Sequence, residues 1–121
     1  MSALHSIGQI AIIVQDPARA KAFYRDTLGL TLLFEAGEMS FFDCGGVRLM
    51  LSRSEQKDAH LSSILYYKTA DIQATAQTLT GKGVVFEQAP HLIAKMPDHE
   101  LWMAFFRDPE GNLLGLMSEV R

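Results

Sequence analysis

The stretch Leu101–Met117, LWMAFFRDPEGNLLGLM, predicts two β-strands joined by one tight turn. Its tryptophan, phenylalanine and leucine residues suit the half-buried surface of a sheet. Four turn-forming residues stand between the strands: Asp108, Pro109, Gly111 and Asn112. We therefore expect a buried hairpin with strands at Leu101–Phe106 and Leu113–Met117.

The residues before this hairpin predict a strand and a helix. Ile64–Thr69 has the composition of a strand, and Asp71 is a suitable N-cap for a helix that ends near Gly81. The apolar side of that helix is formed by Ile72, Ala76 and Leu79. A short strand at Val84–Glu87 then leads toward the hairpin.

The first half of the chain follows the same pattern. Ile7–Val14 is apolar with strand character, and Asp16 with Pro17 marks the start of a helix. Residues at three- and four-residue spacing extend this helix over Ala18–Leu28, and Gly29 ends it. Three short strands are expected next, at Thr31–Glu35, Met39–Asp43 and Val47–Ser52.

Equivalent residues recur at nearly constant spacing in the two halves, which indicates an internal duplication. Asp16 corresponds to Asp71, and Gly29 corresponds to Gly83. The predicted fold class is α+β, with two βαβββ modules at about residues 5–54 and 60–119 inside one domain, 1–121. Each module leaves one apolar sheet face uncovered, so we expect the two sheets to curl into a shared cup, formed within one chain or between two chains.

The DPEGN turn followed by an apolar strand, with a partner segment near the N-terminus, resembles the vicinal oxygen chelate superfamily. That group includes glyoxalase I, extradiol dioxygenases, methylmalonyl-CoA epimerase and the bleomycin-resistance proteins. The resemblance covers nearly the whole chain and implies the cup-shaped glyoxalase/bleomycin resistance-like fold. It also implies a homodimer, the usual state of bleomycin-resistance-like members of this length.

Composition narrows the class of partner. Of the 121 residues 48% are apolar and 21% are charged, as in a globular protein, and the net charge is −3. A nucleic-acid or anionic-membrane surface needs a basic patch, so we expect neither partner and a small-molecule ligand instead. The lone Cys44 allows no intrachain disulfide, and the first residues lack a targeting pattern, so we expect a cytoplasmic protein.

The resemblance implies four positions where metal-dependent relatives carry ligands, and here they hold Gln9, Met50, Ile64 and Gly115. Only the glutamine amide supplies an oxygen, and a thioether suits hard ions poorly. We therefore predict no metal and no cofactor of the family type. His5 and His60 precede the first strand of each half, and the stretch 88–100 adds further donors, His91, Asp98, His99 and Glu100.

Strand alternation assigns an inward face to each sheet if Gln9 points into the cup. The ligand-binding residues predicted on this basis, together with one aromatic candidate, are Gln9, Arg48, Met50, Ile64, Tyr66, Lys68, Trp102 and Gly115. A buried cation needs a partner, so Arg48 and Lys68 either meet an anionic or carbonyl-bearing ligand or extend to solvent. The stretch Gln88–Glu100 is longer than a hairpin requires and is either a lid or a solvated excursion.

Three functions are consistent with these features. The first is a metal-free protein that binds a small planar molecule, like the bleomycin-resistance type. The second is a lyase, isomerase or dioxygenase acting on a small carbonyl or aromatic compound, with acid/base chemistry from Tyr66, Glu38 or His91 or with metal held by unexpected donors. The third is an accessory domain whose cup is filled by its own side chains.

Overall fold

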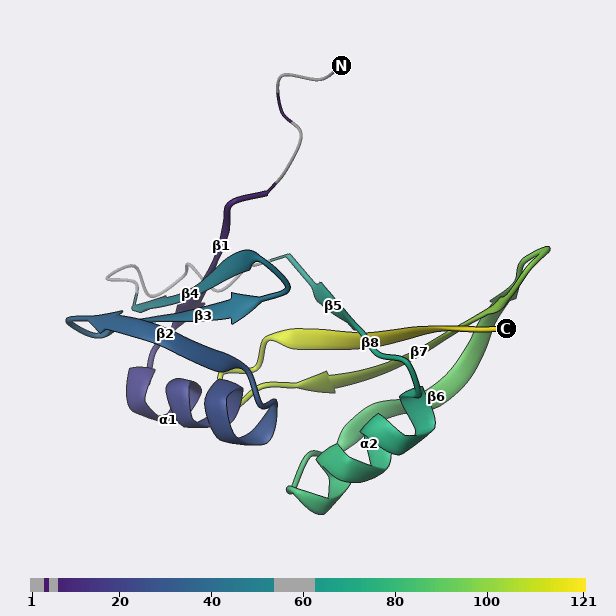
Figure 1. Ribbon diagram of the computed structural model, residues 1–121. Coiled ribbons are helices and arrows are strands. Elements are labelled where there is room, and N and C mark those ends of the chain that lie inside the picture. The colour runs from purple at the N-terminus through teal and green to yellow at the C-terminus, as the bar shows by residue number, and fades with distance from the viewer. Residues whose placement is uncertain (1–3, 5–6, 54–62) are drawn as a thin grey trace. The chain divides into compact units, whose positions relative to one another are not determined.

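The computed structural model describes residues 4, 7–53 and 63–121. The chain divides into two compact units, unit 1 over residues 1–62 and unit 2 over residues 63–121 (Figure 1). Each unit contains a four-stranded sheet and an α-helix. The expected module limits at residues 5, 54 and 60 lie outside the described residues, as do His5 and His60.

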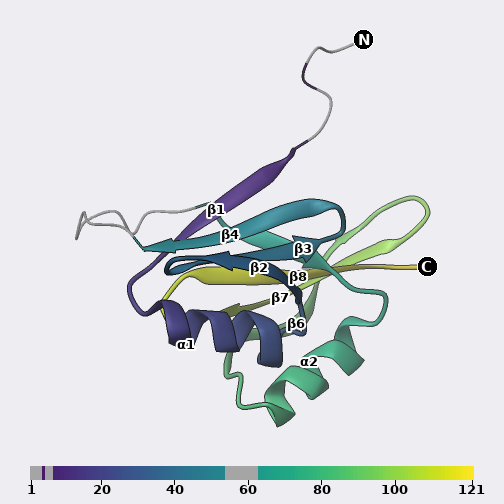
Figure 2. The same cartoon turned by 60° about the vertical axis from the view of Figure 1, so that its left-hand side comes forward.

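Unit 1 has the predicted βαβββ order. Its elements are β1 (Gln9–Val14), α1 (Pro17–Ala22), β2 (Thr31–Ala36), β3 (Met39–Cys44) and β4 (Val47–Arg53). The strands are ordered β1-β4-β3-β2, with β1 parallel to β4 and the other pairs antiparallel. Figure 2 shows α1 running along one face of this sheet.

The first helix is shorter than predicted. Its start is as expected, with the Asp16 side chain accepting a hydrogen bond from the backbone N–H of Arg19 at 3.2 Å. After Ala22 the backbone widens into a π-helical segment, Phe23–Thr27. Tyr24 on this segment is fully buried, with its ring centroid 6.3 Å from that of Phe42. The three- and four-residue spacing of apolar residues could not distinguish an α-helix from a π-helical segment here, because both present one apolar side to the sheet.

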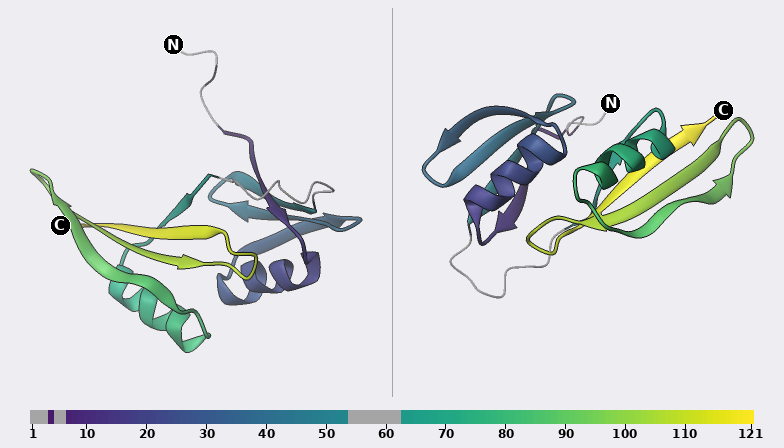
Figure 3. Two further views of the ribbon diagram at one scale, coloured as in Figure 1. Left: turned by 180° about the vertical axis from the view of Figure 1, so that it is seen from behind. Right: turned by 90° about the horizontal axis from the view of Figure 1, so that it is seen from below.

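Unit 2 repeats the topology. Its elements are β5 (Leu65–Lys68), α2 (Ile72–Gly81), β6 (Phe86–Lys95), β7 (Glu100–Arg107) and β8 (Leu113–Val120). The strand order is β5-β8-β7-β6, and β5 is parallel to β8 as β1 is to β4. Each helix is seen with the sheet of its own unit in Figure 3. The predicted α+β fold with duplicated βαβββ modules is thus confirmed.

The turn that joins β7 to β8 is organised by one buried carboxylate. Asp108 is 5% exposed, and its Oδ1 accepts hydrogen bonds from the backbone N–H of Glu110 at 2.9 Å and of Asn112 at 2.8 Å. Its Oδ2 accepts from the side-chain amide of Asn112 at 3.0 Å. Gly111 has a φ of 86°, which disfavours other residues. The expected hairpin is confirmed, and both strands are longer than predicted.

The expectation of a loop over residues 88–100 is wrong. Residues up to Lys95 belong to β6, which pairs with β7, and a tight turn at 96–99 is closed by a 2.8 Å hydrogen bond from Met96 N to His99 O. Register shifts between Phe86 and Ala94 place extra residues in β6, Pro90 among them. An edge strand tolerates such insertions and a proline, so turn-forming residues here do not mark a loop.

Each sheet has one face buried under its helix. In unit 1 this face carries Ile12, Val14, Phe42, Leu49 and Leu51, and in unit 2 it carries Ala104, Phe106, Leu114 and Leu116. Burying one large apolar side chain contributes roughly 1.5–3 kcal/mol, so these faces form the core of each unit. Within the described part of the chain no helix is long and apolar enough to cross a membrane.

The opposite face of each sheet, which we call the distal face, carries the alternate residues of the same strands. The distal face of unit 1 includes Gln9, Ala11, Phe34, Phe41, Arg48 and Met50. The distal face of unit 2 includes Tyr66, Lys68, Met103, Phe105, Gly115 and Met117. Six of the eight predicted ligand-binding residues belong to these two sets.

Candidate functional site

Three predicted residues meet on the distal face of unit 1. Gln9 on β1 is the register partner of Arg48 on β4, and Met50 lies two residues further along β4. The Arg48 Nε donates a hydrogen bond to the Gln9 Oε1 at 2.8 Å. The Gln9 Nε2 lies 3.7 Å from the Met50 Sδ, within reach of a weak hydrogen bond. The Gln9 side chain is therefore held in place from both sides.

Two phenylalanine rings support the guanidinium of Arg48. The rings of Phe34 and Phe41 are stacked with centroids 4.4 Å apart and an interplanar angle of 17°. The Arg48 Cζ lies 6.0 Å from the Phe34 centroid and 5.6 Å from the Phe41 centroid, within cation–π range. Phe41 is buried, whereas Phe34 is 46% exposed. A cation thus rests on an apolar platform with one accessible ring.

Arg48 forms no ion pair within the residues that the structure describes. Asp43 is its register partner on β3, but the Asp43 Oδ1 accepts a hydrogen bond from the backbone N–H of Gly46 at 3.2 Å. By contrast, Arg53 on the same strand pairs with Glu38 at 3.4 Å. The terminal nitrogens of Arg48 accordingly have no carboxylate partner in the described ranges.

Aromatic rings also gather on the distal face of unit 2. Tyr66 on β5 and Phe105 on β7 are both register partners of Gly115 on β8. The two rings meet edge to face with centroids 5.8 Å apart and an interplanar angle of 82°. A Cβ atom at Gly115 would lie 2.8 Å from Tyr66 Cδ2 and 3.2 Å from Phe105 Cε1. The rings therefore occupy the space above the glycine.

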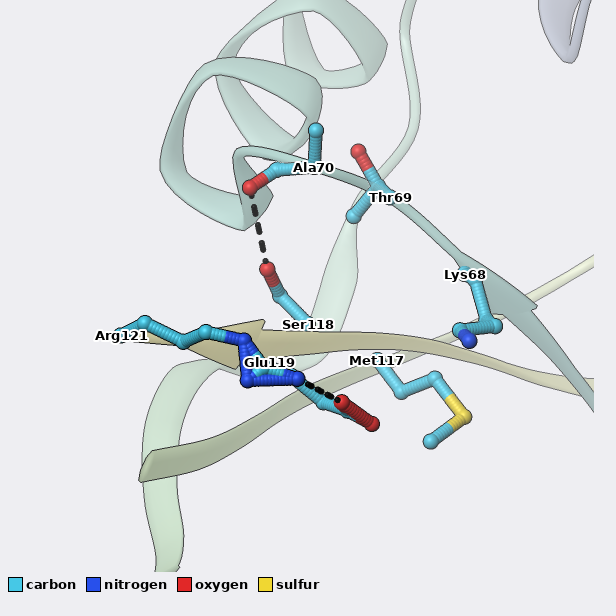
Figure 4. A pocket seen from close by; sticks show the side chains of 7 residues that line it. All are labelled: Lys68, Thr69, Ala70, Met117, Ser118, Glu119 and Arg121. Carbon is cyan, nitrogen blue, oxygen red and sulfur yellow. Dashed lines mark hydrogen bonds and ion pairs between the residues drawn. The ribbon is translucent and has the colours of Figure 1, made fainter. Parts of the chain in front are cut away.

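A hollow of about 300 Å³ lies in unit 2 beside the last residues of β5 and β8 (Figure 4). Lys68 and Met117 from the distal face contribute to its lining. Most of the other lining residues are polar, and Ser118 Oγ donates a hydrogen bond to the Ala70 carbonyl at 3.3 Å. Arg121 pairs with the Glu119 carboxylate at 3.2 Å. Lys68 is the one predicted ligand-binding residue at this hollow.

A second hollow, of about 370 Å³, lies in unit 1 between the start of α1 and the β2–β3 turn. Its lining is rich in charged residues, and Lys21 pairs with Glu35 across it at 2.9 Å. None of the eight predicted ligand-binding residues lines it.

Two predicted residues are not grouped with the others. Ile64 precedes β5 and is 42% exposed, so it lies outside the sheet pairing. Trp102 is the register partner of Ser118, which places it on the helix-side face of unit 2 rather than the distal face. Its indole N–H donates to the Glu100 Oε1 at 3.2 Å.

Several of the side chains considered for acid/base chemistry or for a second metal site have local partners. Glu38 pairs with Arg53, and the His91 Nδ1 donates to the Ala89 carbonyl at 2.8 Å. The His99 Nδ1 lies 2.7 Å from the Asp98 carboxylate and holds the pKa of that acid below its ordinary value of 3.8. In the described ranges no three His, Cys, Asp or Glu side chains come together as a metal-binding group.

The residues at the four positions where relatives carry metal ligands do not together supply enough donors to hold a metal ion. The single oxygen donor, Gln9, accepts a hydrogen bond from Arg48. Gly115 has no side chain, and the rings of Tyr66 and Phe105 fill the space that a ligand there would enter. The residues present do not fit a metal centre of the family type.

The duplicated fold matches that of a known family. The family model for the Glyoxalase/Bleomycin resistance protein/Dioxygenase superfamily matches residues 6–116, and the chain belongs to this superfamily. The resemblance inferred from the DPEGN turn is thus confirmed.

Individual relatives agree with this membership. The uncharacterized protein YraH of Bacillus subtilis is 33% identical over 124 residues, covering 88% of this chain and 92% of that protein. A superfamily member from Sphaerobacter thermophilus is 27% identical with a TM-score of 0.78, covering 96% of this chain and 98% of its own. A lactoylglutathione lyase from Agrobacterium tumefaciens, 20% identical with a TM-score of 0.75 and coverage of 97% and 96%, shares the fold.

The platform residue Phe34 was missed at the sequence level. A register shift between Leu32 and Phe34 inserts one residue into β2, and this insertion brings Phe34 opposite Phe41. Simple alternation carried across such an insertion gives the wrong face. No glycine or proline marks the shift in the sequence, so no local signal could have located it.

Proposed function

We propose that this chain is a small-molecule-binding protein of the glyoxalase/bleomycin resistance type that holds its ligand without a bound metal ion. Ligand sites are mostly apolar surfaces with a few fixed polar groups, and the distal faces have this character. The predicted shared cup, the homodimer and the cytoplasmic location stay predictions beside this proposal.

The observation that carries the proposal is the arrangement over Gly115. Where metal-dependent relatives are expected to place a ligand side chain, this chain has a glycine under the rings of Tyr66 and Phe105. Tyr66 is 45% exposed, so one side of its ring is available for contact. An aromatic surface of this kind favours a flat apolar group, because edge-to-face and offset contacts between rings are favourable.

A thermal-shift screen of small planar and aliphatic compounds, run in EDTA and again with Mn²⁺, Ni²⁺ or Zn²⁺, tests the proposal. We expect planar compounds to stabilise the protein in EDTA, since a ligand at a hundred times its Kd adds about 2.7 kcal/mol. Plasma mass spectrometry on protein purified without chelator should find substoichiometric metal. Stabilisation that appears only with a metal ion would contradict the proposal, and so would a screen in which no compound stabilises.

A pair of variants assigns the binding to the aromatic surface. Tyr66→Ala removes the exposed ring and should weaken a planar ligand roughly 3- to 10-fold, the effect of losing one aromatic contact. Val85→Ala is the matched control, because Val85 is an exposed apolar residue of unit 2 outside its sheet pairing. Equal affinity of the ligand for the parent protein and for Tyr66→Ala would show that this aromatic surface is not part of the binding site.

A further inference from the structure

The distal face of unit 1 presents a cation, Arg48, that forms no ion pair with any residue in the part of the chain that the structure describes. Arg48 stands over stacked phenylalanine rings, and its Nε donates to Gln9 at 2.8 Å. No carboxylate of the described residues pairs with it. From this arrangement we infer that Arg48 and Phe34 recognise a planar monocarboxylate, the carboxylate on the guanidinium and the flat group on the exposed ring. This inference rests on the proposed ligand-binding function and gives the class of ligand that the distal face of unit 1 takes.

The guanidinium is held before any ligand arrives. A free arginine side chain loses considerable rotamer entropy when it is fixed, and this loss weakens binding. Here the bond to Gln9 and the two rings already restrict the side chain, and Met50 contacts Gln9 from the other side. Because the Nε is used, the Nη1 and Nη2 edge remains for a bidentate contact with a carboxylate.

The charge of the ligand follows from the count of cations on this face. The described residues on the distal face of unit 1 include one arginine and no lysine. A single guanidinium matches one negative charge, whereas a phosphate dianion would leave a charge without a partner. Asp43, the register neighbour of Arg48, further disfavours a second negative charge.

The shape of the ligand follows from the platform. The rings of Phe34 and Phe41 lie 17° from parallel, and Phe34 stays 46% exposed in this stack. A flat group attached to the carboxylate can lie against this ring, while a puckered aliphatic ring makes a poorer contact. The ligand class is therefore an aromatic or otherwise planar carboxylate.

Isothermal titration of the protein in EDTA with three probes separates the contribution of the charge from that of the planar group. The probes are 2-naphthoate, its neutral analogue 2-naphthamide, and cyclohexanecarboxylate, which keeps the charge without the planar group. We expect 2-naphthoate to bind about 10-fold or more tightly than 2-naphthamide, the effect of a hydrogen bond to a charged group. It should also bind several-fold more tightly than cyclohexanecarboxylate.

Variants of Arg48 and Phe34 test which side chain causes the preference for 2-naphthoate over the other probes. Arg48→Gln should reduce 2-naphthoate affinity to that for 2-naphthamide, and Arg48→Lys should restore it only in part because lysine lacks the planar fork. Phe34→Leu should weaken 2-naphthoate and 2-naphthamide equally. The matched control is Arg53→Gln, which removes an arginine from the same strand five residues away, hence on the other face.

The outcomes distinguish this inference from the proposed function. Equal affinity for 2-naphthoate and 2-naphthamide, or an Arg48→Gln variant that keeps the preference, would overturn the inference. Failure of 2-naphthoate to bind while other compounds from the thermal-shift screen bind in EDTA would overturn it and leave the proposed function standing. If no compound binds at all, both are overturned. Circular dichroism of each variant should match that of the parent protein, because the substituted arginines and Phe34 are exposed.

Discussion

The contact between Gly115 and the rings above it makes Gly115→Ala an informative perturbation. A Cβ at this position would lie 2.8 Å from Tyr66 Cδ2, 3.1 Å from Tyr66 Cε2 and 3.2 Å from Phe105 Cε1. Carbon atoms in contact prefer about 3.5–4.0 Å, so at least the Tyr66 ring must move by several tenths of an ångström. The backbone itself does not exclude alanine, because Gly115 does not have a positive φ.

Two opposing effects set the magnitude of the change. Overpacking of this kind costs typically 1–3 kcal/mol. Replacing a glycine by alanine where the backbone allows it stabilises by about 0.4–1 kcal/mol, through the unfolded chain. Because Tyr66 is partly exposed and can turn aside, we expect a net loss of about 1 kcal/mol in the free energy of unfolding.

Urea unfolding followed by the fluorescence of Trp102, the single tryptophan, measures this loss. The same substitution made together with Tyr66→Ala should lose its cost, giving a coupling of about 1–2 kcal/mol between the two positions. Gly81→Ala is the control, because nothing lies within 4 Å of its added Cβ and its φ is not positive. That variant should be at least as stable as the parent protein. If Gly115→Ala is no less stable than the parent protein and shows no coupling to Tyr66, the Tyr66 ring does not pack tightly over Gly115 and the predicted overpacking is refuted.

Three further predictions concern the turn, the acid range and the cysteine. Asp108→Ala should lower the free energy of unfolding by about 2–4 kcal/mol in urea titration, because three donors lose their buried acceptor. The hydrogen bond from His99 lowers the pKa of Asp98, so NMR titration should place that pKa below 3.8, and His99→Ala should raise it. Because the pKa of Asp98 is lower in the folded than in the unfolded protein, the ionised Asp98 stabilises the fold above the unfolded pKa. This stabilisation is lost as the pH falls through the folded pKa. Asp98→Asn should therefore abolish this part of the pH dependence of stability. Burial, and secondarily the charge of Asp43, raises the pKa of Cys44 above 9.0. Its alkylation by iodoacetamide should therefore be slow at neutral pH, rise with pH and level off only above the raised pKa, and Asp43→Asn should shift that plateau to lower pH.

Features that repeat along the chain were predictable from the sequence. The N-caps Asp16 and Asp71 and the DPEGN turn are local signals whose chemistry hardly depends on the rest of the fold. The duplicated topology followed from their spacing. Likewise the alternation of β1 and β4 placed Gln9 and Arg48 on one face, because neither strand contains an inserted residue.

The features that could not be predicted depend mainly on register shifts in the edge strands β2 and β6. Phe34 and the course of residues 88–95 are both governed by register shifts, which carry no reliable signature in one sequence. Trp102 was chosen for its chemistry alone, and its register with Ser118 decides its face instead. Which side chains meet across strands is thus set by pairing, not by composition.

The inserted residues on β2 and β6 also bear on how readily another chain could pair with the edges of the two sheets. Both are edge strands, and both expose large apolar side chains, such as Leu33 on β2 and Ile93 on β6. An unbroken strand of this kind offers a straight row of donors and acceptors on which another chain could add, the first step toward aggregates. Each insertion interrupts that row and increases the local twist, and Pro90 removes a donor outright. The irregular edges therefore make β2 and β6 poor templates for fibril growth despite their exposed apolar side chains.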